Sequence, residues 1–382
     1  MTMKSFTSTF TSLAFVVLLY VSCSQSSSGD ETLNNVPNAP AGFTAQTLYD
    51  GFKNPWGMAW LPDGRMLVTE RAGDILVFKN DKFTGEKIQG LPKVFNEGQG
   101  GLLDIVVHPK YSENKWIYIS YAKPVDGGAT TAIARFKLNG NQVTDLVDLF
   151  TAKPYLNNAD YHFGSRIVFD KNGYLFFSSG ERGTQPKVQE LNNDHGKIHR
   201  IYDDGRIPND NPFVKTAGAN ASIWTLGHRN PQGMVYDAAT DRIWAAEHGP
   251  KGGDELNLIE KGKNYGWPKT CYGINYDGTV LTEFKELPGI ENPKRYWVPS
   301  IGPCGITIVK SAKYPDWKDN ILVGALAFKH VARVQLNGTK YVTEEKLLDG
   351  VARVRDVKES PEGFLYVITE GPGLMVKLVP TK

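Results

Sequence analysis

Short runs of apolar residues alternate with turn-forming residues along most of this chain. The repeated unit is an apolar segment, a turn rich in Pro, Asp, Asn and Gly, a second apolar segment and then a polar loop. Apolar segments of this length, separated by such turns, are typical of β-hairpins, and no long stretch with the 3.6-residue period of a helix competes with them. The pattern therefore predicts an all-β protein.

The repeated unit occurs six times, and the copies begin at Trp56, Leu102, Ser165, Gln232, Gly305 and Val354. Their spacing of roughly 45 to 75 residues suits four-stranded antiparallel blades with insertions of variable length. We predict a six-bladed β-propeller over residues 42–382. The strand at 43–48 is expected to pair with the strand at 374–379 and so close the ring. A pair of β-sandwiches is the alternative, but it explains the repetition poorly.

The first 22 residues have the character of an export signal, because the apolar run at 13–21 is short for a membrane span. Cys23 follows at the position of the lipidated residue in bacterial lipoproteins. The Ser-, Asn-, Pro- and Gly-rich segment 23–41 predicts a flexible linker. We expect an exported protein, periplasmic or an outer-membrane lipoprotein of a bacterium, with a lipid on Cys23 as its link to the membrane. Tyr20 stands where Leu is usual in such signals, so plain secretion is the alternative.

Charge and cysteine content narrow the class of partner. The formal net charge is +2 and both signs are interspersed along the 382 residues, which argues against a nucleic acid or an anionic membrane surface as a partner. Besides Cys23 the chain has Cys271 and Cys304. In an exported protein this pair is consistent with a disulfide, and two buried free thiols are the alternative.

The polar loops of the six units carry the candidate chemistry. In a propeller, corresponding loops of all blades open on one face around the central channel. The loops expected on that face contain Gln99, His162, Arg229, Asn230, Gly249, Pro250, Lys329, Arg353 and Arg355. Four of these are cations, which would repel one another unless an anionic ligand lies between them. Because arginine favours two-point contacts with carboxylates or phosphates, the sequence predicts an anion site at the channel mouth.

Two further features of these loops suggest catalysis and calcium binding. His162 is expected beside the anion site and is a candidate general base, with a structural role as the alternative. Gly249 and Pro250 offer backbone carbonyls, and Asp254 and Glu255 follow within reach. Hard oxygen ligands suit Ca²⁺, and no His/Cys cluster has zinc spacing. A plain surface turn is the alternative interpretation of this segment.

Several long motifs resemble one known family. The segments GHRNPQG at 227–233, EHGPKGGDELNLI at 247–259 and KGKNYGWP at 261–268 occur in order, and the similarity extends over residues 54–377. They resemble the soluble, pyrroloquinoline quinone (PQQ)-dependent glucose/sorbosone dehydrogenases, and most closely the aldose sugar dehydrogenase branch.

The resemblance implies a propeller that binds PQQ, a tricarboxylate ortho-quinone, over the channel. The implied reaction oxidises the C1 hydroxyl of an aldose to a lactone and passes electrons to a separate acceptor. His162 matches the catalytic base of the family and one of its PQQ contacts. The other matching PQQ contacts are Gln99, Arg229, Asn230, Lys329, Arg353 and Arg355. The matching calcium ligands are Gly249 and Pro250 for the Ca²⁺ that also holds PQQ, and Glu255 and the backbone of Tyr265 for a further Ca²⁺.

Departures from the family pattern keep other functions open. Tyr161 and His248 stand where some glucose-oxidising members have Asp and Gln, and the segment from Cys271 to Gly305 is short. The short segment favours the aldose branch, with its broader range of sugars. One alternative function is a Ca²⁺-dependent propeller lactonase, which has no need of so many cations. The other is a non-catalytic binding propeller, which would be expected to lose the base or the cations.

Overall fold

The computed structural model describes residue 2, residues 42–157 and residues 159–381. The predicted signal segment apart from Thr2, Cys23 and the linker at 23–41 lie outside the described residues. The chain divides into two units, Met1–Glu31 and Thr32–Lys382, and all the elements below belong to the second. In the part of the chain that the structure describes, no helix is long and apolar enough to cross a membrane.

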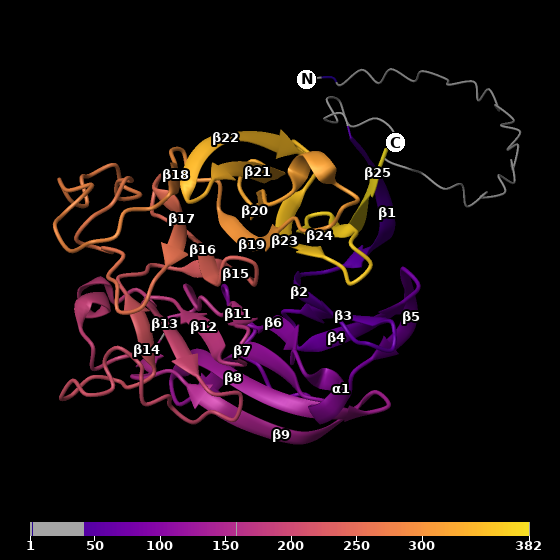
Figure 1. The fold of residues 1–382 in the computed structure, drawn as a ribbon, viewed down its shortest axis with the longest axis horizontal. Helices are drawn as coiled ribbons and strands as arrows, with labels where there is room; N and C mark the ends of the chain where they lie inside the picture. The colour runs from indigo at the N-terminus through magenta and orange to yellow at the C-terminus, as the bar shows by residue number, and fades with distance from the viewer. Residues whose placement is uncertain (1, 3–41, 158, 382) are drawn as a thin grey trace, which may run out of the picture. The chain divides into compact units, whose positions relative to one another are not determined.

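Six antiparallel sheets surround a central axis (Figure 1), which confirms the predicted six-bladed β-propeller. The first blade comprises β2 (Pro55–Trp60), β3 (Arg65–Glu70), β4 (Asp74–Lys79) and β5 (Lys82–Lys87). The second comprises β6 (Leu102–Val107), β7 (Ile117–Val125), β8 (Gly128–Asn139) and, both on β8, β9 (Gln142–Thr151) and the short β10 (Leu156–Asn157). The third comprises β11 (Ile167–Phe169), β12 (Leu175–Ser179), β13 (Lys197–Ile201) and β14 (Ile223–Leu226).

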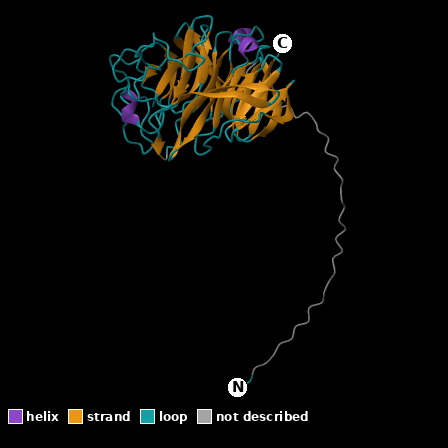
Figure 2. Cartoon of the chain, turned by 90° about the horizontal axis from the view of Figure 1, so that it is seen from below, coloured by secondary structure: helices purple, strands orange, loops and turns teal. Residues whose placement is uncertain are grey.

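The remaining blades repeat this arrangement, and strands dominate the side view in Figure 2. The fourth comprises β15 (Pro231–Asp237), β16 (Arg242–Glu247), β17 (Asp254–Ile259) and β18 (Arg295–Trp297). The fifth comprises β19 (Pro303–Ile308), β20 (Ile321–Ala325), β21 (His330–Asn337) and β22 (Lys340–Leu347). The sixth comprises β23 (Arg353–Glu359), β24 (Leu365–Glu370), β25 (Gly373–Pro380) and β1 (Phe43–Phe52). The helical turns are α1 (Tyr111–Asn114), η1 (Gln185–Gln189) and η2 (Pro315–Trp317).

The first described strand closes the ring. β1 is the outermost strand of the sixth blade and pairs antiparallel with β25, from Phe43 opposite Pro380 to Phe52 opposite Gly373. This pairing confirms the predicted closure. Apolar side chains then fill the six junctions between neighbouring blades, one cluster at each junction. The strands are buried on both faces because each blade packs between two others.

Five of the six innermost hairpins contain a register shift near the start of the inner strand. A β-bulge breaks the alternation of side chains and turns one of them in a new direction. Three residues at these shifts meet one another: Arg355 Nη1 donates to Gln232 Oε1 at 2.7 Å, and the Arg355 guanidinium lies 5.9 Å from the Trp56 ring centre. The bulges therefore shape the part of the propeller where the blades converge.

Candidate functional site

The predicted site residues lie at one end of the six blades, which we call the site face. Gln99 and His162 precede β6 and β11, Arg229 and Asn230 precede β15, and Arg353 opens β23. All inner strands of a propeller run the same way along the axis, so their starts share one face. The turns between the second and third strands open on the same face and carry Gly249, Pro250 and Lys329.

His162 is held by two hydrogen bonds on the site face. Its backbone N–H donates to Gln99 Oε1 at 2.9 Å, and its ring Nδ1 bonds to Glu181 Oε1. The residue has a positive φ of 55°, and its side chain is 12% exposed. Because a carboxylate only accepts, the neutral imidazole carries its proton on Nδ1 and has a lone pair on Nε2. The open nitrogen is therefore the one that can accept a proton from a ligand.

The surroundings of His162 favour its neutral form. Burial lowers the pKa of His162 below its usual value, the hydrogen bond to the Glu181 carboxylate opposes that effect, and the charge of Arg229 lowers the pKa further. The net direction is downward, so the imidazole is unprotonated at neutral pH. A buried, neutral histidine held by a carboxylate has the properties of a general base.

Tyr161, which directly precedes His162, packs against its ring. Its side chain is 40% exposed and its ring lies edge-to-face against His162, with ring centres 4.8 Å apart. The guanidinium of Arg182 holds the Tyr161 carbonyl and stacks on Phe163 at 3.5 Å. Gly183 has a positive φ of 78°, and a Cβ atom there would lie 2.5 Å from the Tyr161 hydroxyl, so a side chain at this position would displace the ring. Glu181, not residue 161, orients the base.

Arginine side chains gather around Glu370 on the same face. Arg355 is 6% exposed and donates through Nε to Glu370 Oε1 at 2.8 Å, and Arg353 Nε lies 3.7 Å from Glu370 Oε2. Burial would raise the pKa of Glu370, but the charges of Arg355, Arg353 and Arg71 lower it below its usual value. Three cations share one carboxylate here, which leaves net positive charge. Lys329 is exposed on its turn, with a φ of 51°.

Among the residues that the structure describes, four of the twelve buried polar atoms without hydrogen-bond partners belong to residues around His162. In the described ranges, buried atoms of this kind include Glu181 Oε2, Arg229 Nε, Asn230 Nδ2 and His248 Nε2. Burial and the charges of Arg229 and Arg355 lower the pKa of His248 to about 3, so this ring is neutral. Native structures rarely leave such atoms unpaired, and a cluster of them indicates a ligand that supplies the missing partners.

The turn at Gly249 and Pro250 presents its carbonyls to the same region. Arg229 Nη1 donates to Gly249 O at 2.6 Å, and Ser300 Oγ donates to Pro250 O at 3.1 Å. Asp254, which the sequence placed within reach of a metal, instead accepts the N–H of Gly249 at 2.7 Å and is 1% exposed. The Asp254 carboxylate holds the turn together, because a backbone N–H group donates to each of its two oxygens.

Glu255 and Tyr265 border a small cavity beside this turn. The cavity measures about 10 Å³, enough for one water-sized occupant or ion, and Glu247 and Trp267 also line it. Burial, and then the charge of Glu247, raise the pKa of Glu255 to about 8. Two carboxylates in one buried cavity favour a cation, although the described residues hold no cluster of three or more acidic, His or Cys ligands. Any metal here would depend on backbone oxygens as well.

The two cysteines do not form a disulfide. Cys271 and Cys304 are both free and buried. Cys304 Sγ donates to Val354 O at 2.8 Å, while Cys271 Sγ accepts the N–H of Gly273 at 3.2 Å. Burial raises the pKa of Cys271 to about 11 and of Cys304 to about 12, so both remain unreactive thiols. Of the two alternatives that the sequence allowed, the structure supports buried free thiols.

Residues 52–377 match the family described as Glucose / Sorbosone dehydrogenase. The chain belongs to this family. It is 41% identical over 350 residues to Aldose sugar dehydrogenase YliI of Escherichia coli (strain K12), covering 90% of this chain and 94% of the relative.

Solved structures in this family have the same fold. The apo-form of the soluble aldose sugar dehydrogenase of Escherichia coli is 40% identical, with a TM-score of 0.85, covering 89% of this chain and 100% of that one. The PQQ-bound aldose sugar dehydrogenase of Streptomyces coelicolor is 27% identical, with a TM-score of 0.72, covering 90% of this chain and 100% of that one.

Some residues of the site in this glucose/sorbosone dehydrogenase were missed by the sequence analysis. Glu181 lies 19 positions after His162, and Gln232 lies 123 positions before Arg355. Glu181 follows the Ser-Ser-Gly end of a strand and opens a polar loop, which is the signal that could have found it. Gln232 and Glu247 carry no comparable signal, because bulges and packing between strands decide which residues they meet.

Proposed function

We propose that this glucose/sorbosone dehydrogenase is a PQQ-dependent enzyme that oxidises the C1 hydroxyl of aldoses to lactones. The observation that carries the proposal is the neutral, Glu181-bound His162 surrounded by cations and unpaired buried donors. The PQQ-bound relative and the aldose sugar dehydrogenases among the similar proteins support the choice of cofactor and substrate.

The residues on the site face fit an anionic quinone. Arg353, Arg355 and Lys329 would hold carboxylates through charge-assisted hydrogen bonds. Arg229 Nε and Asn230 Nδ2 are buried donors that such a ligand would satisfy. Bound PQQ would supply the acceptor for the hydride that leaves C1. The same cations would stabilise the additional negative charge of the reduced cofactor.

His162 would act on the substrate hydroxyl. Nε2 accepts the proton of the C1 hydroxyl as the C1–H hydride departs, and the new C1=O bond completes the lactone. Glu181 would stabilise the imidazolium that forms, because its carboxylate already bonds to Nδ1. The proton returns to solvent from His162, and the electrons pass to a separate acceptor.

Calcium has two places in this proposal. Gly249 and Pro250 would offer carbonyls to one Ca²⁺, and Gly249 O would first give up its bond to Arg229. That exchange is plausible only with an anionic quinone to engage the guanidinium, so this ion and PQQ would bind together. Glu255 and the Tyr265 backbone would hold the second Ca²⁺ in the small cavity, where the Glu255 carboxylate lacks compensation.

The proposal is tested with purified apoprotein. We expect no glucose oxidation with a dye acceptor after exhaustive chelation, and activity only when PQQ and Ca²⁺ are both added. Ca²⁺ alone should raise the unfolding temperature, and Glu255→Gln should abolish that gain. Lactone hydrolysis without PQQ would instead indicate a lactonase. Full oxidation activity without PQQ would refute the assignment.

A further inference from the structure

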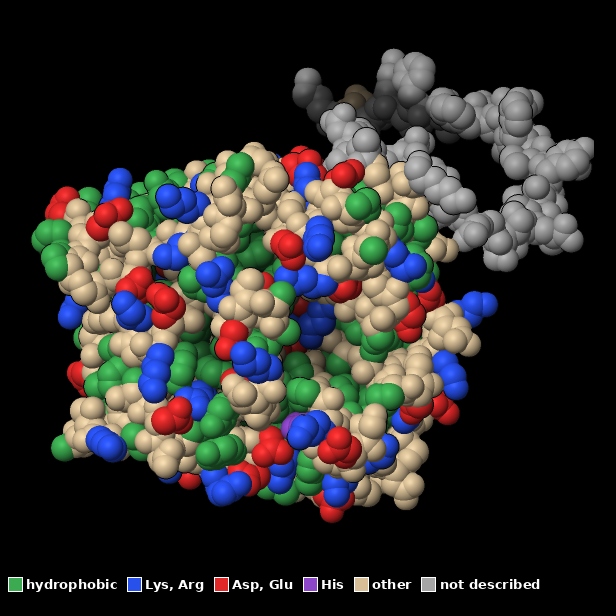
Figure 3. All heavy atoms as spheres, viewed as in Figure 1, with side chains coloured by type: hydrophobic (Ala, Val, Ile, Leu, Met, Phe, Trp, Pro, Cys, Tyr) green, Lys and Arg blue, Asp and Glu red, His purple; other side chains and the backbone are tan. Residues whose placement is uncertain are grey.

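The face opposite the site is hollowed across its width. Hollows of about 230 Å³, 340 Å³ and 560 Å³ lie at the junction of the first and sixth blades, at the axis, and at the junction of the third and fourth blades. Trp60 borders the first and second hollows, and Tyr236 borders the second and third. Neighbouring hollows thus share a lining residue, and we call the three together the far-face groove. Hollows with hydrophobic floors are visible in Figure 3.

Charges of both signs are balanced along the far-face groove. The first hollow is lined by two basic and two acidic side chains. The axial hollow has two basic and one acidic, and the third hollow has two basic and three acidic. Figure 3 shows blue and red side chains interspersed on the surface. A nucleic acid or a charged polymer would require an excess of one sign. The balance favours a ligand that is polar but uncharged.

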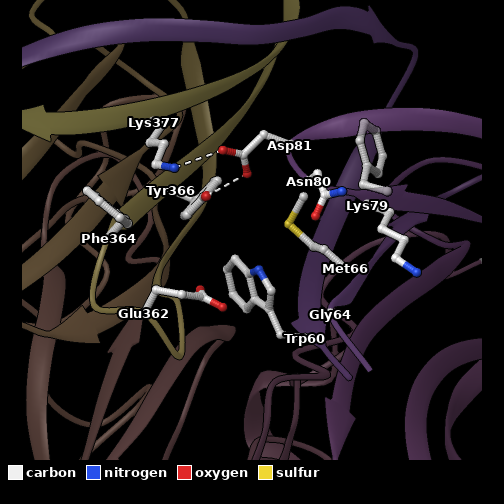
Figure 4. A pocket seen from close by; sticks show the side chains of 11 residues that line it. Trp60, Gly64, Met66, Lys79, Asn80, Asp81, Glu362, Phe364, Tyr366 and Lys377 are labelled. Atoms are coloured by element: carbon white, nitrogen blue, oxygen red, sulfur yellow. Dashed lines mark hydrogen bonds and ion pairs between the residues drawn. The ribbon is translucent and has the colours of Figure 1, made fainter. Parts of the chain in front are cut away.

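Aromatic rings stand at intervals along the groove. Figure 4 shows the indole of Trp60 in the first hollow, with the Glu362 carboxylate beside it. Trp60 packs edge-on against Tyr366, with ring centres 5.3 Å apart. In the third hollow the Tyr236 hydroxyl donates to Asp241 Oδ1 at 2.7 Å, and Trp224 also lines the hollow, with the Arg200 guanidinium 4.8 Å from its ring centre. Ring faces cover the C–H surface of a sugar, while neighbouring carboxylates and guanidinium groups bond to its hydroxyls.

Two buried arginines in the groove have unused donors. Arg166 is 1% exposed and Arg200 is 4% exposed, and neither Nη2 of the first nor Nε of the second has a hydrogen-bond partner. Both side chains are fixed in place, because Arg166 bonds to Asp104 at 3.0 Å and Arg200 bonds to Asp210 at 3.0 Å. Arg166 lines the axial hollow and Arg200 the third. Such donors are costly to bury without an acceptor, and hydroxyl oxygens would supply one.

We propose that the far-face groove binds a neutral oligosaccharide chain, separately from the candidate active site. The length of the groove, its spaced rings, its balanced charge and its unpaired donors all suit an extended, polyhydroxylated ligand. This binding would hold a polymer on one face of the propeller and leave the other face open to free sugars. It does not depend on PQQ or on His162.

The test uses the full protein and reduced maltohexaose, which has no hemiacetal C1 and cannot be oxidised. Calorimetry should detect binding that strengthens from the disaccharide to the hexasaccharide and is unchanged by saturating PQQ. Trp60→Ala removes a stacking face and should weaken binding about tenfold. Glu362→Ala, an exposed change that leaves the core intact, should weaken it by roughly two- to fivefold. Tyr341→Ala, an exposed tyrosine on β22 that lines none of the hollows, is the matched control.

Several outcomes would overturn the proposal. One is an absence of binding at millimolar oligosaccharide. Another is an equal affinity of the wild-type protein and the Trp60→Ala and Glu362→Ala variants for the oligosaccharide. A third is tighter binding of hexagalacturonate than of the neutral chain. Competition by PQQ would place the sugar on the site face and would also overturn it. Loss of aldose oxidation in every condition would refute the proposed function alone, because groove binding is measured with a sugar that cannot react.

Discussion

In the proposed reaction His162 and the arginines have different roles, proton transfer and cofactor binding, and separate experiments can distinguish them. The imidazole bonds to Glu181 through Nδ1, which leaves Nε2 for the substrate hydroxyl in the proposed reaction, whereas Arg353 and Arg355 lie around Glu370. A base contributes to the chemical step, and a cation that holds a carboxylate contributes mainly to cofactor affinity. A substitution of His162 should therefore lower the rate of the chemical step, and a substitution of either arginine should lower the affinity for the cofactor.

His162→Ala should lower kcat on the order of 10²- to 10⁴-fold while PQQ affinity changes little. Arg353→Ala or Arg355→Ala should weaken PQQ binding by roughly one to two decades, because a charge-assisted contact is lost. Saturating PQQ should restore turnover to the arginine variants and not to His162→Ala. Titration of PQQ with binding and turnover followed together decides this. Arg206→Ala, on the exposed surface, is the control, and rescue of His162→Ala by PQQ would contradict the roles assigned.

Glu181→Gln tests whether Glu181 raises the pKa of His162. The neutral imidazole is the active form, so kcat/KM should fall as the pH drops below the pKa of His162. Glu181 raises that pKa against burial and against Arg229, so its neutralisation should move the acid limb of the profile to lower pH. Turnover should also fall on the order of tenfold, since the amide N–H can donate to Nδ1 and so favour the tautomer with its proton on Nε2. An unchanged acid limb and unchanged kcat would show that Glu181 does not act on the base.

At the scale of elements, the bulges of the inner hairpins connect the fold to the site. Trp56, Gln232 and Arg355 each lie at the register shift of a different inner strand, and Arg355 contacts the other two there. The fit is close: a Cβ atom at Gly305 would lie 1.8 Å from Asp356 Oδ1. The bulges thus fix the position of Arg355, and any substitution that straightens β23 should disturb cofactor binding.

The closing strand β1 also has a measurable role. Phe43 is 5% exposed, and its ring meets Trp317 edge-on with ring centres 5.5 Å apart. Phe43→Ala removes a buried ring and should cost about 3–5 kcal/mol of unfolding free energy. The loss should appear as a lower midpoint in thermal or urea unfolding, with Tyr341→Ala as the exposed control. An unchanged midpoint would show that β1 contributes little to the closed ring.

At the scale of the whole molecule, the two faces of the propeller differ in charge. Cations dominate around Glu370 on the site face, whereas the far-face groove carries both signs in near balance. The net charge of the whole chain, +2, does not reveal this difference in charge between the two faces. The site face suits anions and the groove suits neutral polar chains, so one compact set of blades can serve two ligands.

Export and anchoring are predicted for the whole chain from its first 23 residues. If Cys23 is lipidated, the wild-type protein should fractionate with membranes, and Cys23→Ala should release it to the soluble fraction. Mass spectrometry of the mature N-terminus gives an independent measurement. A wild-type protein that is already soluble and begins beyond Cys23 would contradict the anchor.

Much of the fold could be predicted because its signals are local. Alternating apolar segments and turns define a hairpin within about 20 residues, and six such hairpins indicate blades. The expected pairing of the strand at 43–48 with the strand at 374–379 is the observed pairing of β1 with β25. Strand composition and turn residues act over short distances along the chain, so the sequence alone determined the six blades, the closure and the loops that carry His162, Arg229 and Arg355.

The partners of those residues were decided only by tertiary structure. The bond from Glu181 to His162, the role of Asp254 within its turn, the free state of Cys271 and Cys304 and the groove on the opposite face all join segments that are separate in sequence. Each depends on bulges, on burial and on which blades lie side by side. These are properties of the packed molecule, because a hydrogen bond or a pKa responds to distance in space and not to spacing along the chain.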